Sequence, residues 1–158
     1  MSTQKYEIEH VQVAEPEKDC AALIAMLTGL ELAEVWARLP ERLRKTGGWY
    51  GRDFIAVFRH LGYDCSHRFV KFDPGTKYPC LMRFGPSARG LVWARKRKRR
   101  ESGDPTAQLT EYEKQWWNVF VYYDGLVYEP RYPGPWLFHT MGDDVRVTSM
   151  LQVWISDL

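Results

Sequence analysis

The pattern of the sequence changes at Gly62, and this change constrains the fold more than any other feature. Before Gly62, apolar residues recur at the three- and four-residue spacing that is typical of helices. After it, β-forming residues stand between turn formers such as Asp73-Pro74-Gly75. Helices followed by antiparallel strands predict an α+β domain, with an N-terminal helical half packed against a C-terminal antiparallel β-sheet.

Three helices are predicted within residues 19–61, the helical half. The first begins at Asp19, a good N-cap residue, and ends at Gly29, the residue type that favours a helix C-terminus. This segment is apolar nearly all round, so we expect it to be buried on most sides. The second helix is stopped by Pro40, and the third covers residues 53–61.

The β half is predicted over residues 65–94 and 117–155. Its clearest feature is a hairpin in which Asp124-Gly125 joins two strands, because Asp-Gly is a preferred two-residue turn. Further strands are expected at Cys65–Phe72, Tyr78–Phe84, Leu91–Ala94 and Val145–Ile155. Residues 95–115 are predicted to form an inserted polar loop.

The length of 158 residues fits one domain, residues 1–158. A hydrophobic fraction of 45% excludes a disordered chain. No apolar run reaches the roughly 18 residues of a membrane span, and the first residues lack the pattern of a secretory signal. The cysteines Cys20, Cys65 and Cys80 lack the spacing of zinc or disulfide motifs, so we expect no metal, no cofactor and a cytoplasmic protein with no membrane partner.

Positive charge is concentrated in one segment. The chain carries 22 Lys and Arg against 20 Asp and Glu, a net charge of +2, and without six consecutive basic residues it would be 2 − 6 = −4. These residues are Arg95, Lys96, Arg97, Lys98, Arg99 and Arg100. Such a run attracts nucleic acid phosphates or an acidic protein, and the nearby aromatic residues Trp93, Tyr112, Trp116 and Trp117 could stack on bases if exposed. The alternative is a solvated loop beside core tryptophans.

Cys20 is the candidate nucleophile. It lies in the first turn of the first predicted helix, where unpaired N–H groups and the helix dipole lower a thiol pKa. The negative charge of Asp19 acts in the opposite direction. The alternative is that Cys20 is a core residue, since cysteine is among the most often buried residue types.

The order of these features resembles the papain-like cysteine peptidases, in particular their compact bacterial and phage branch, which includes the double-glycine leader peptidases. The resemblance rests on the helix Asp19–Gly29, on Tyr78–Phe84, and on the hairpin Asn118–Pro130 with its Val-Tyr-Glu-Pro ending. It implies a papain-like fold with a substrate groove for a peptide or protein. In that family a cysteine attacks the carbonyl, a histidine takes its proton, and a carboxylate or amide orients the imidazole.

The resemblance assigns roles to four positions in this sequence. Cys20 matches the nucleophile, with Ala21 replacing the glycine usual after it. The histidine position falls on or near Asn118, and Glu129 falls where the orienting carboxylate is expected. Gln12 is the upstream glutamine, but it lies eight residues before Cys20, about two further than the pattern requires for an oxyanion donor.

The residue at position 118 separates two hypotheses. A carboxamide does not titrate near neutral pH, so Asn118 cannot act as general base. The first hypothesis is therefore a pseudoenzyme that binds a peptide or protein in a degenerate groove. The second is an active thiol hydrolase with another base, for which His139 is the best placed of the four histidines because it lies in the later β half. A binder of nucleic acid or an acidic protein through residues 95–100 is the third.

Overall fold

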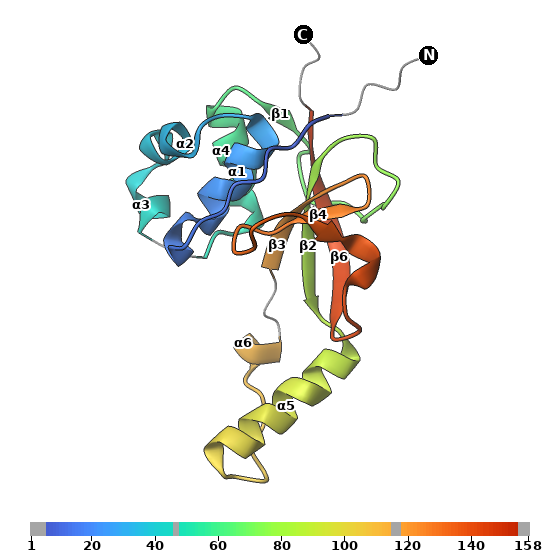
Figure 1. The fold of residues 1–158 in the computed structure, drawn as a ribbon. Helices are drawn as coiled ribbons and strands as arrows, with labels where there is room; N and C mark the ends of the chain where they lie inside the picture. The colour runs from blue at the N-terminus through green and yellow to red at the C-terminus, as the bar shows by residue number, and fades with distance from the viewer. Residues whose placement is uncertain (1–5, 46–47, 115–117, 155–158) are drawn as a thin grey trace.

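A computed structural model describes residues 6–45, 48–114 and 118–154. Its N-terminal half is helical, as predicted, and Figure 1 shows these helices gathered on one side of the sheet. A 3-10 turn, η1 (Pro16–Lys18), precedes α1 (Asp19–Thr28), α2 (Leu32–Arg38), α3 (Glu41–Arg44) and α4 (Gly51–His60). Gly29 ends α1 with a left-handed φ of 76°, but the predicted N-cap role of Asp19 is wrong, since Asp19 is already helical.

Within the described part of the chain, no single helix is both long enough and apolar enough to cross a membrane. The helices Pro16–Thr28 and Leu32–Arg38 are together long and apolar enough for a span, with a bend of 116° at the break between them.

The C-terminal half forms a six-stranded antiparallel sheet, which confirms the α+β class. The order across the sheet is β1-β6-β2-β3-β4-β5, so β2 lies between the longest strand and the hairpin. Both edge strands, β1 and β5, are two residues long. The strands are β1 (Asp64–Cys65), β2 (Cys80–Pro86), β3 (Asn118–Tyr123), β4 (Leu126–Tyr128), β5 (Trp136–Leu137) and β6 (Val145–Trp154), with the 3-10 turn η2 (Phe138–Thr140) before β6.

The predicted hairpin is confirmed. Strands β3 and β4 pair antiparallel and meet at Asp124-Gly125, with φ of 49° and 81°. Both turn residues therefore adopt the left-handed region that a type I′ turn requires. The last predicted strand is confirmed as β6, with its expected end at Ile155 outside the described residues.

Two of the predicted strands are wrong. Of Cys65–Phe72, only Cys65 lies in a strand, and Val70 makes a single bridge to Met150. Leu91–Ala94 belongs to a helix, α5 (Ala88–Ser102). A short apolar run without alternation does not distinguish a strand from a helix, which explains the second error.

Side chains along each strand point alternately to the two faces of the sheet, and both faces are buried. One face packs on helices α1 to α4, and the other is covered by the segments around Phe72 and Phe138. The buried hydrophobic strand residues on the helix side are Cys65, Leu81, Val119, Val121, Tyr123, Tyr128, Leu151 and Val153, and those on the other side are Cys80, Met82, Phe84, Tyr122, Val127 and Met150.

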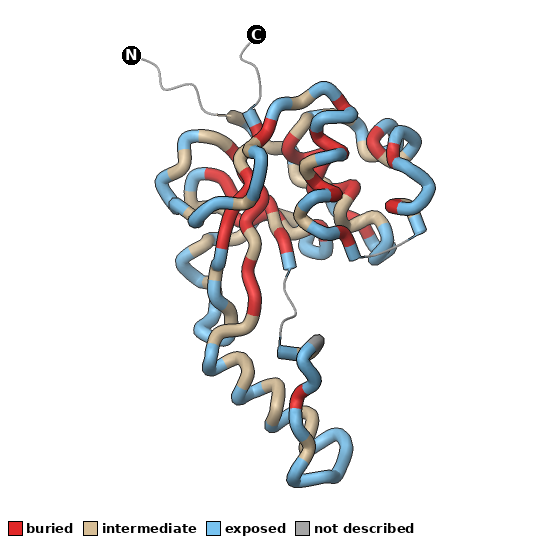
Figure 2. Tube along the Cα trace, turned by 180° about the vertical axis from the view of Figure 1, so that it is seen from behind, coloured by how far each residue is buried: buried red, intermediate tan, exposed pale blue. Residues whose placement is uncertain are grey.

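The predicted polar loop is also wrong, because the basic run is helical. Helix α5 contains all six residues of the run and is followed by an irregular segment and the short helix α6 (Glu111–Lys114). Residues 87–114, here called the arm, connect neighbouring strands β2 and β3 and project away from the sheet and the helices (Figures 1 and 2). Arg and Lys are good helix formers, so the composition of the run supports a helix once its charges find partners.

The base of the arm is fixed by Ser87 and Gly90. The Ser87 hydroxyl accepts a hydrogen bond from the Gly90 N–H at 3.1 Å, which caps α5, and donates one to the Asp143 carbonyl at 2.5 Å. A Cβ atom at position 90 would overlap the carbonyl oxygen of Asp144. Glycine at this position therefore allows α5 to start directly against the segment before β6.

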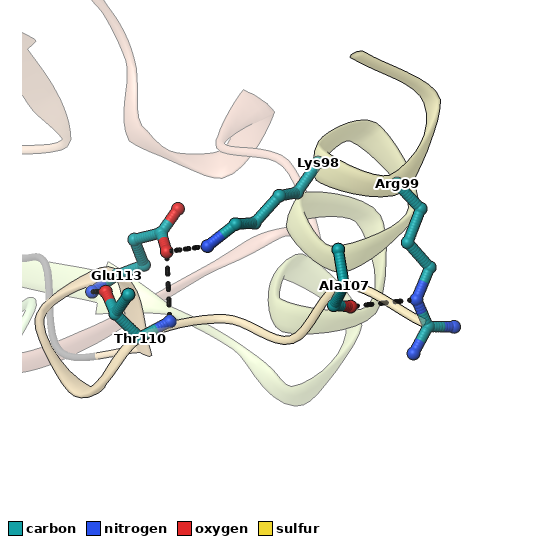
Figure 3. Close-up of polar contacts among 5 residues, drawn as sticks. All are labelled: Lys98, Arg99, Ala107, Thr110 and Glu113. Carbon is teal, nitrogen blue, oxygen red and sulfur yellow. Dashed lines mark hydrogen bonds and ion pairs between the residues drawn. The ribbon is translucent and has the colours of Figure 1, made fainter. Parts of the chain in front are cut away.

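Side chains of α5 hold the returning segment of the arm (Figure 3). The Lys98 ammonium donates to the Glu113 carboxylate at 2.5 Å, and Arg99 donates to the Ala107 carbonyl at 3.0 Å. The Thr110 N–H donates to the same carboxylate oxygen of Glu113 at 2.9 Å. Two charges of the basic run are thus used to hold the arm together.

Candidate functional site

Residues far apart in the sequence meet in a small pocket between α1 and β3. Cys20, Asn118 and Glu129 all line this cavity of about 150 Å³, here called the Cys20 pocket. The other lining residues are Asp19, Leu23, Gly48, Trp49, Phe54, Val119, Phe120, Pro130 and Arg131. The three positions that the resemblance selected are therefore neighbours in space.

The thiol of Cys20 is held in its protonated form. Burial raises its pKa to about 12, and the nearby carboxylates of Asp19 and Asp53 act in the same direction. The backbone N–H of Trp49 hydrogen-bonds to the sulfur and opposes this shift without cancelling it. The expectation of a thiol pKa lowered by the helix N-terminus is therefore wrong, because burial and two negative charges outweigh the helix dipole.

Asp53 fixes the segment that faces the Cys20 sulfur. Its side chain is 4% exposed, accepts the Tyr50 N–H at 2.8 Å, and forms an ion pair with Arg42 at 3.0 Å. The first bond caps helix α4 and sets the backbone just after Trp49. The indole of Trp49 is itself buried and donates to the Leu43 carbonyl at 3.3 Å. Sequence reasoning missed Trp49 and Asp53 as parts of the site.

A salt bridge connects the two halves at the pocket. Arg131, just after the hairpin, donates to both carboxylate oxygens of Asp19 at 2.9 and 3.1 Å. The carboxylate of Asp19 thus serves the contact between α1 and the β half instead of capping its own helix.

Asn118 and Glu129 differ in how they reach the pocket. Asn118 is exposed at the start of β3, and its side-chain oxygen accepts the N–H of Val119 at 2.9 Å. Strand alternation groups Asn118 with Phe120, opposite to Val119, so Asn118 lies at the edge of the pocket. Glu129 is half-buried after β4, and burial raises its pKa; the charge of Asp19 acts in the same direction, and the charge of Arg131 opposes the shift without cancelling it.

None of the four histidines, all of which lie in described segments, lines the Cys20 pocket. His139 is exposed in η2, away from the pocket lining, and Gln12 is exposed as well. The structure thus does not bring His139 or Gln12 to Cys20.

His10 contacts both the hairpin and the loop that follows it. Its Nε2 atom is 2.6 Å from the Tyr132 carbonyl oxygen, and its ring stacks on Tyr128 at 6.2 Å between centroids. Next to it, the Val13 N–H donates to the Pro130 carbonyl at 2.9 Å. The N-terminal segment therefore packs along the loop that follows β4.

A larger cavity adjoins the Cys20 pocket. It has a volume of about 1010 Å³ and shares two lining residues, Phe120 and Glu129, with the smaller one. Four of its thirteen lining residues are aromatic, with Phe84 and Phe120 at 4.7 Å between centroids, and the segment Tyr132–Trp136 forms one side. Sequence reasoning did not identify this cavity, because its wall combines β2, β3 and the segment before β6.

The six basic residues 95–100 lie in the arm, and none of them lines either cavity. Lys98 and Arg99 are engaged within the arm, whereas Lys96, Arg97 and Arg100 are exposed. Arg95 is half-buried on α5. Trp93 is 57% exposed, while Trp116, Trp117 and the side chain of Tyr112 lie outside what the structure describes.

Comparisons with protein-family models, with curated proteins and with solved structures give no match to this chain. Across the described ranges, no three His, Cys, Asp or Glu side chains gather in a way that could hold a metal ion.

Proposed function

We propose that this chain is a catalytically degenerate relative of the papain-like cysteine peptidases that binds a peptide segment in the groove formed by its two adjoining cavities. The observation that carries the proposal is the meeting of Cys20, Asn118 and Glu129 in one pocket, although about 100 residues separate the first two. A helix-borne cysteine facing a strand start and the end of a hairpin is the arrangement that the resemblance implies.

The chemistry of the pocket supports binding over turnover. A thiol with a pKa near 12 carries almost no thiolate at neutral pH, and the thiolate is the attacking species. The described histidines do not line the pocket, and the Asn118 amide cannot accept a proton. General base action contributes roughly 10²- to 10⁴-fold to such reactions, so its loss leaves a groove without efficient catalysis.

The larger cavity suits an apolar side chain of an extended peptide. Its volume of about 1010 Å³ and its four aromatic lining residues offer apolar surface, and the Glu129 carboxylate at the junction of the two cavities can accept a hydrogen bond from a peptide N–H. Concave sites lined by apolar groups with a few polar ones are typical of binding sites.

Site-specific alkylation of Cys20 tests the absence of catalysis. Iodoacetamide would be added across a pH series, and the Cys20 adduct quantified by peptide mass mapping of the unmodified chain. We expect the rate to rise about tenfold per pH unit without a plateau up to about pH 10, since only the thiolate reacts. A plateau below about pH 8 would show an activated thiol and an active hydrolase.

Selection of peptides from a random display library tests the groove. We expect selected peptides to carry an apolar anchor and to bind Cys20→Ala within about twofold of wild type, because no covalent step is used. Phe120→Lys should abolish binding, whereas Leu137→Lys, an exposed position on β5, should not. Peptides that bind Phe120→Lys as well as wild type would exclude the groove as the binding site.

A further inference from the structure

The arm presents a cationic stripe with an aromatic residue in it. Trp93, Lys96, Arg97 and Arg100 are all exposed on α5 and follow one another at spacings of three, one and three residues. These positions lie on one side of a helix and span about 10 Å along its axis. We call this stripe the outer face of α5.

The other residues of the basic run are not part of the outer face. Lys98 and Arg99 hold the returning segment of the arm, on the other side of the helix. Among the described residues, no carboxylate forms an ion pair with the three cations of the outer face: the ion pairs of α5 involve Arg89 with Asp143 and Lys98 with Glu113. The outer face therefore keeps its charge available for a ligand.

Trp93 distinguishes this surface from a simple charged patch. Its indole is 57% exposed, and the Lys96 ammonium lies 5.7 Å from the ring centroid, which holds the ring within the cationic stripe. An exposed aromatic ring flanked by cations is the combination by which single-stranded nucleic acids are bound: phosphates contact the cations, and a base stacks on the ring.

A hollow beside the stripe offers room for that base. It has a volume of about 550 Å³, and its lining includes Trp93 and Arg97 of the stripe together with Arg89, Asp143 and Asp144. Arg89 forms an ion pair with Asp143 at 3.1 Å, so this hollow is closer to neutral than the stripe, and carboxylate oxygens can accept hydrogen bonds from base amino groups. The phosphates therefore belong on the stripe towards Arg100, and the base belongs beside Trp93.

We propose that the outer face of α5 binds single-stranded nucleic acid, with phosphates on Lys96, Arg97 and Arg100 and a base stacked on Trp93. The stripe shares no residue with the peptide groove, although Asp144 lines both the larger cavity of that groove and the hollow beside Trp93. Three phosphate contacts predict a salt dependence of log K on log salt with a slope of about −2 for a single strand.

Fluorescence anisotropy with a labelled oligothymidylate of about 20 nucleotides, over a KCl series, tests the proposal. In Lys96→Gln/Arg97→Gln/Arg100→Gln we expect affinity at low salt to fall by about tenfold or more, with the slope approaching zero. The matched control Arg68→Gln/Lys71→Gln/Lys77→Gln removes three exposed cations from the body and should keep the slope. Circular dichroism of each variant verifies that α5 is intact.

Trp93→Ala is the second variant in this test. Loss of base stacking should weaken oligothymidylate binding about 5- to 150-fold, with the salt slope unchanged. Equal losses in the outer-face and control variants would overturn the proposal. So would unchanged affinity in Trp93→Ala together with equal displacement by polyglutamate, which would identify the stripe as a surface for an acidic protein.

Discussion

At the scale of single residues, Cys20 shows that position on a helix does not decide reactivity. The residue lies in the first turn of α1, yet burial, Asp19 and Asp53 raise its pKa to about 12. The sequence was sufficient to select Cys20, Asn118 and Glu129 as neighbours. It was not sufficient to place Trp49 or Asp53 beside them, because their segment is positioned by tertiary contacts with Arg42 and Leu43.

Asp19→Asn tests the electrostatic part of this environment. Removal of the neighbouring negative charge should lower the Cys20 pKa, so that alkylation at a fixed pH near 8 speeds up by about three- to tenfold. Glu17→Gln, in the turn before α1, is the matched control and should change the rate much less. The measurement is the initial rate of Cys20 adduct formation. Equal rates in wild type and Asp19→Asn would contradict the assigned cause.

Asp53→Ala tests the support of the Trp49 segment. The substitution removes the N-terminal cap of α4 and the partner of Arg42, and we expect the free energy of unfolding to fall by about 2 kcal/mol. Glu34→Ala, which breaks the exposed ion pair with Arg38, should change it by less than about 0.5 kcal/mol. Urea denaturation measures both. A loss in Asp53→Ala no greater than that in Glu34→Ala would refute the supporting role.

At the scale of elements, the hairpin and α1 follow from local signals, whereas α5 does not. Asp124-Gly125 and Gly29 each adopt the backbone conformation that their residue types favour. The basic run was predicted to lie in an inserted polar loop, as a solvated run of charges. Its neutralising partner, Glu113, lies 15 residues after Lys98 on the returning segment, which local reasoning does not reach.

Acidification should loosen the arm before the body unfolds. Hydrogen bonds from Lys98 and Thr110 lower the pKa of Glu113 from 4.5 to about 2. A lowered carboxyl pKa contributes stability above pH 4.5 that is lost as pH falls towards about 2. Hydrogen exchange of the arm amides should therefore speed up over this range relative to β2. The pKa of Asp104, also in the arm, is lowered by hydrogen bonds from Thr106, so Glu113→Gln should reduce this pH dependence to the part that belongs to Asp104. An undiminished pH dependence in Glu113→Gln would show another cause.

At the scale of the whole molecule, both core clusters lie in the body, and Leu109 is the only buried residue of the arm among those that the structure describes. Neither cluster of buried apolar residues on the two faces of the sheet contains a residue of the arm. The periodicity change at Gly62 was therefore enough to predict the α+β class, since it reports on the body alone. The insertion of residues 95–115 between the two β stretches was predicted, but its helical structure and its projection from between β2 and β3 were not.

Replacement of residues 87–117 by a short Gly-rich turn should leave the body folded. Strands β2 and β3 already pair antiparallel up to Phe84 and Asn118, so a tight turn can join them. We expect a single cooperative thermal transition, retained peptide binding and loss of oligothymidylate binding. Without a cooperative transition by circular dichroism, the arm would have to be counted as part of the folding unit.

The two-residue strands at both margins of the sheet have a consequence for the behaviour of the protein in concentrated solution. A long, flat margin offers unpaired N–H and C=O groups to another chain and so promotes fibre growth. Here β1 and β5 are too short to act as such templates, but β1 covers only Val153 and Trp154 of the extended strand β6, and Val70 adds a single bridge at Met150. Within the described part of the chain, no strand pairs with the outer side of residues 145–149, so this stretch of β6 is where another chain could pair with the sheet.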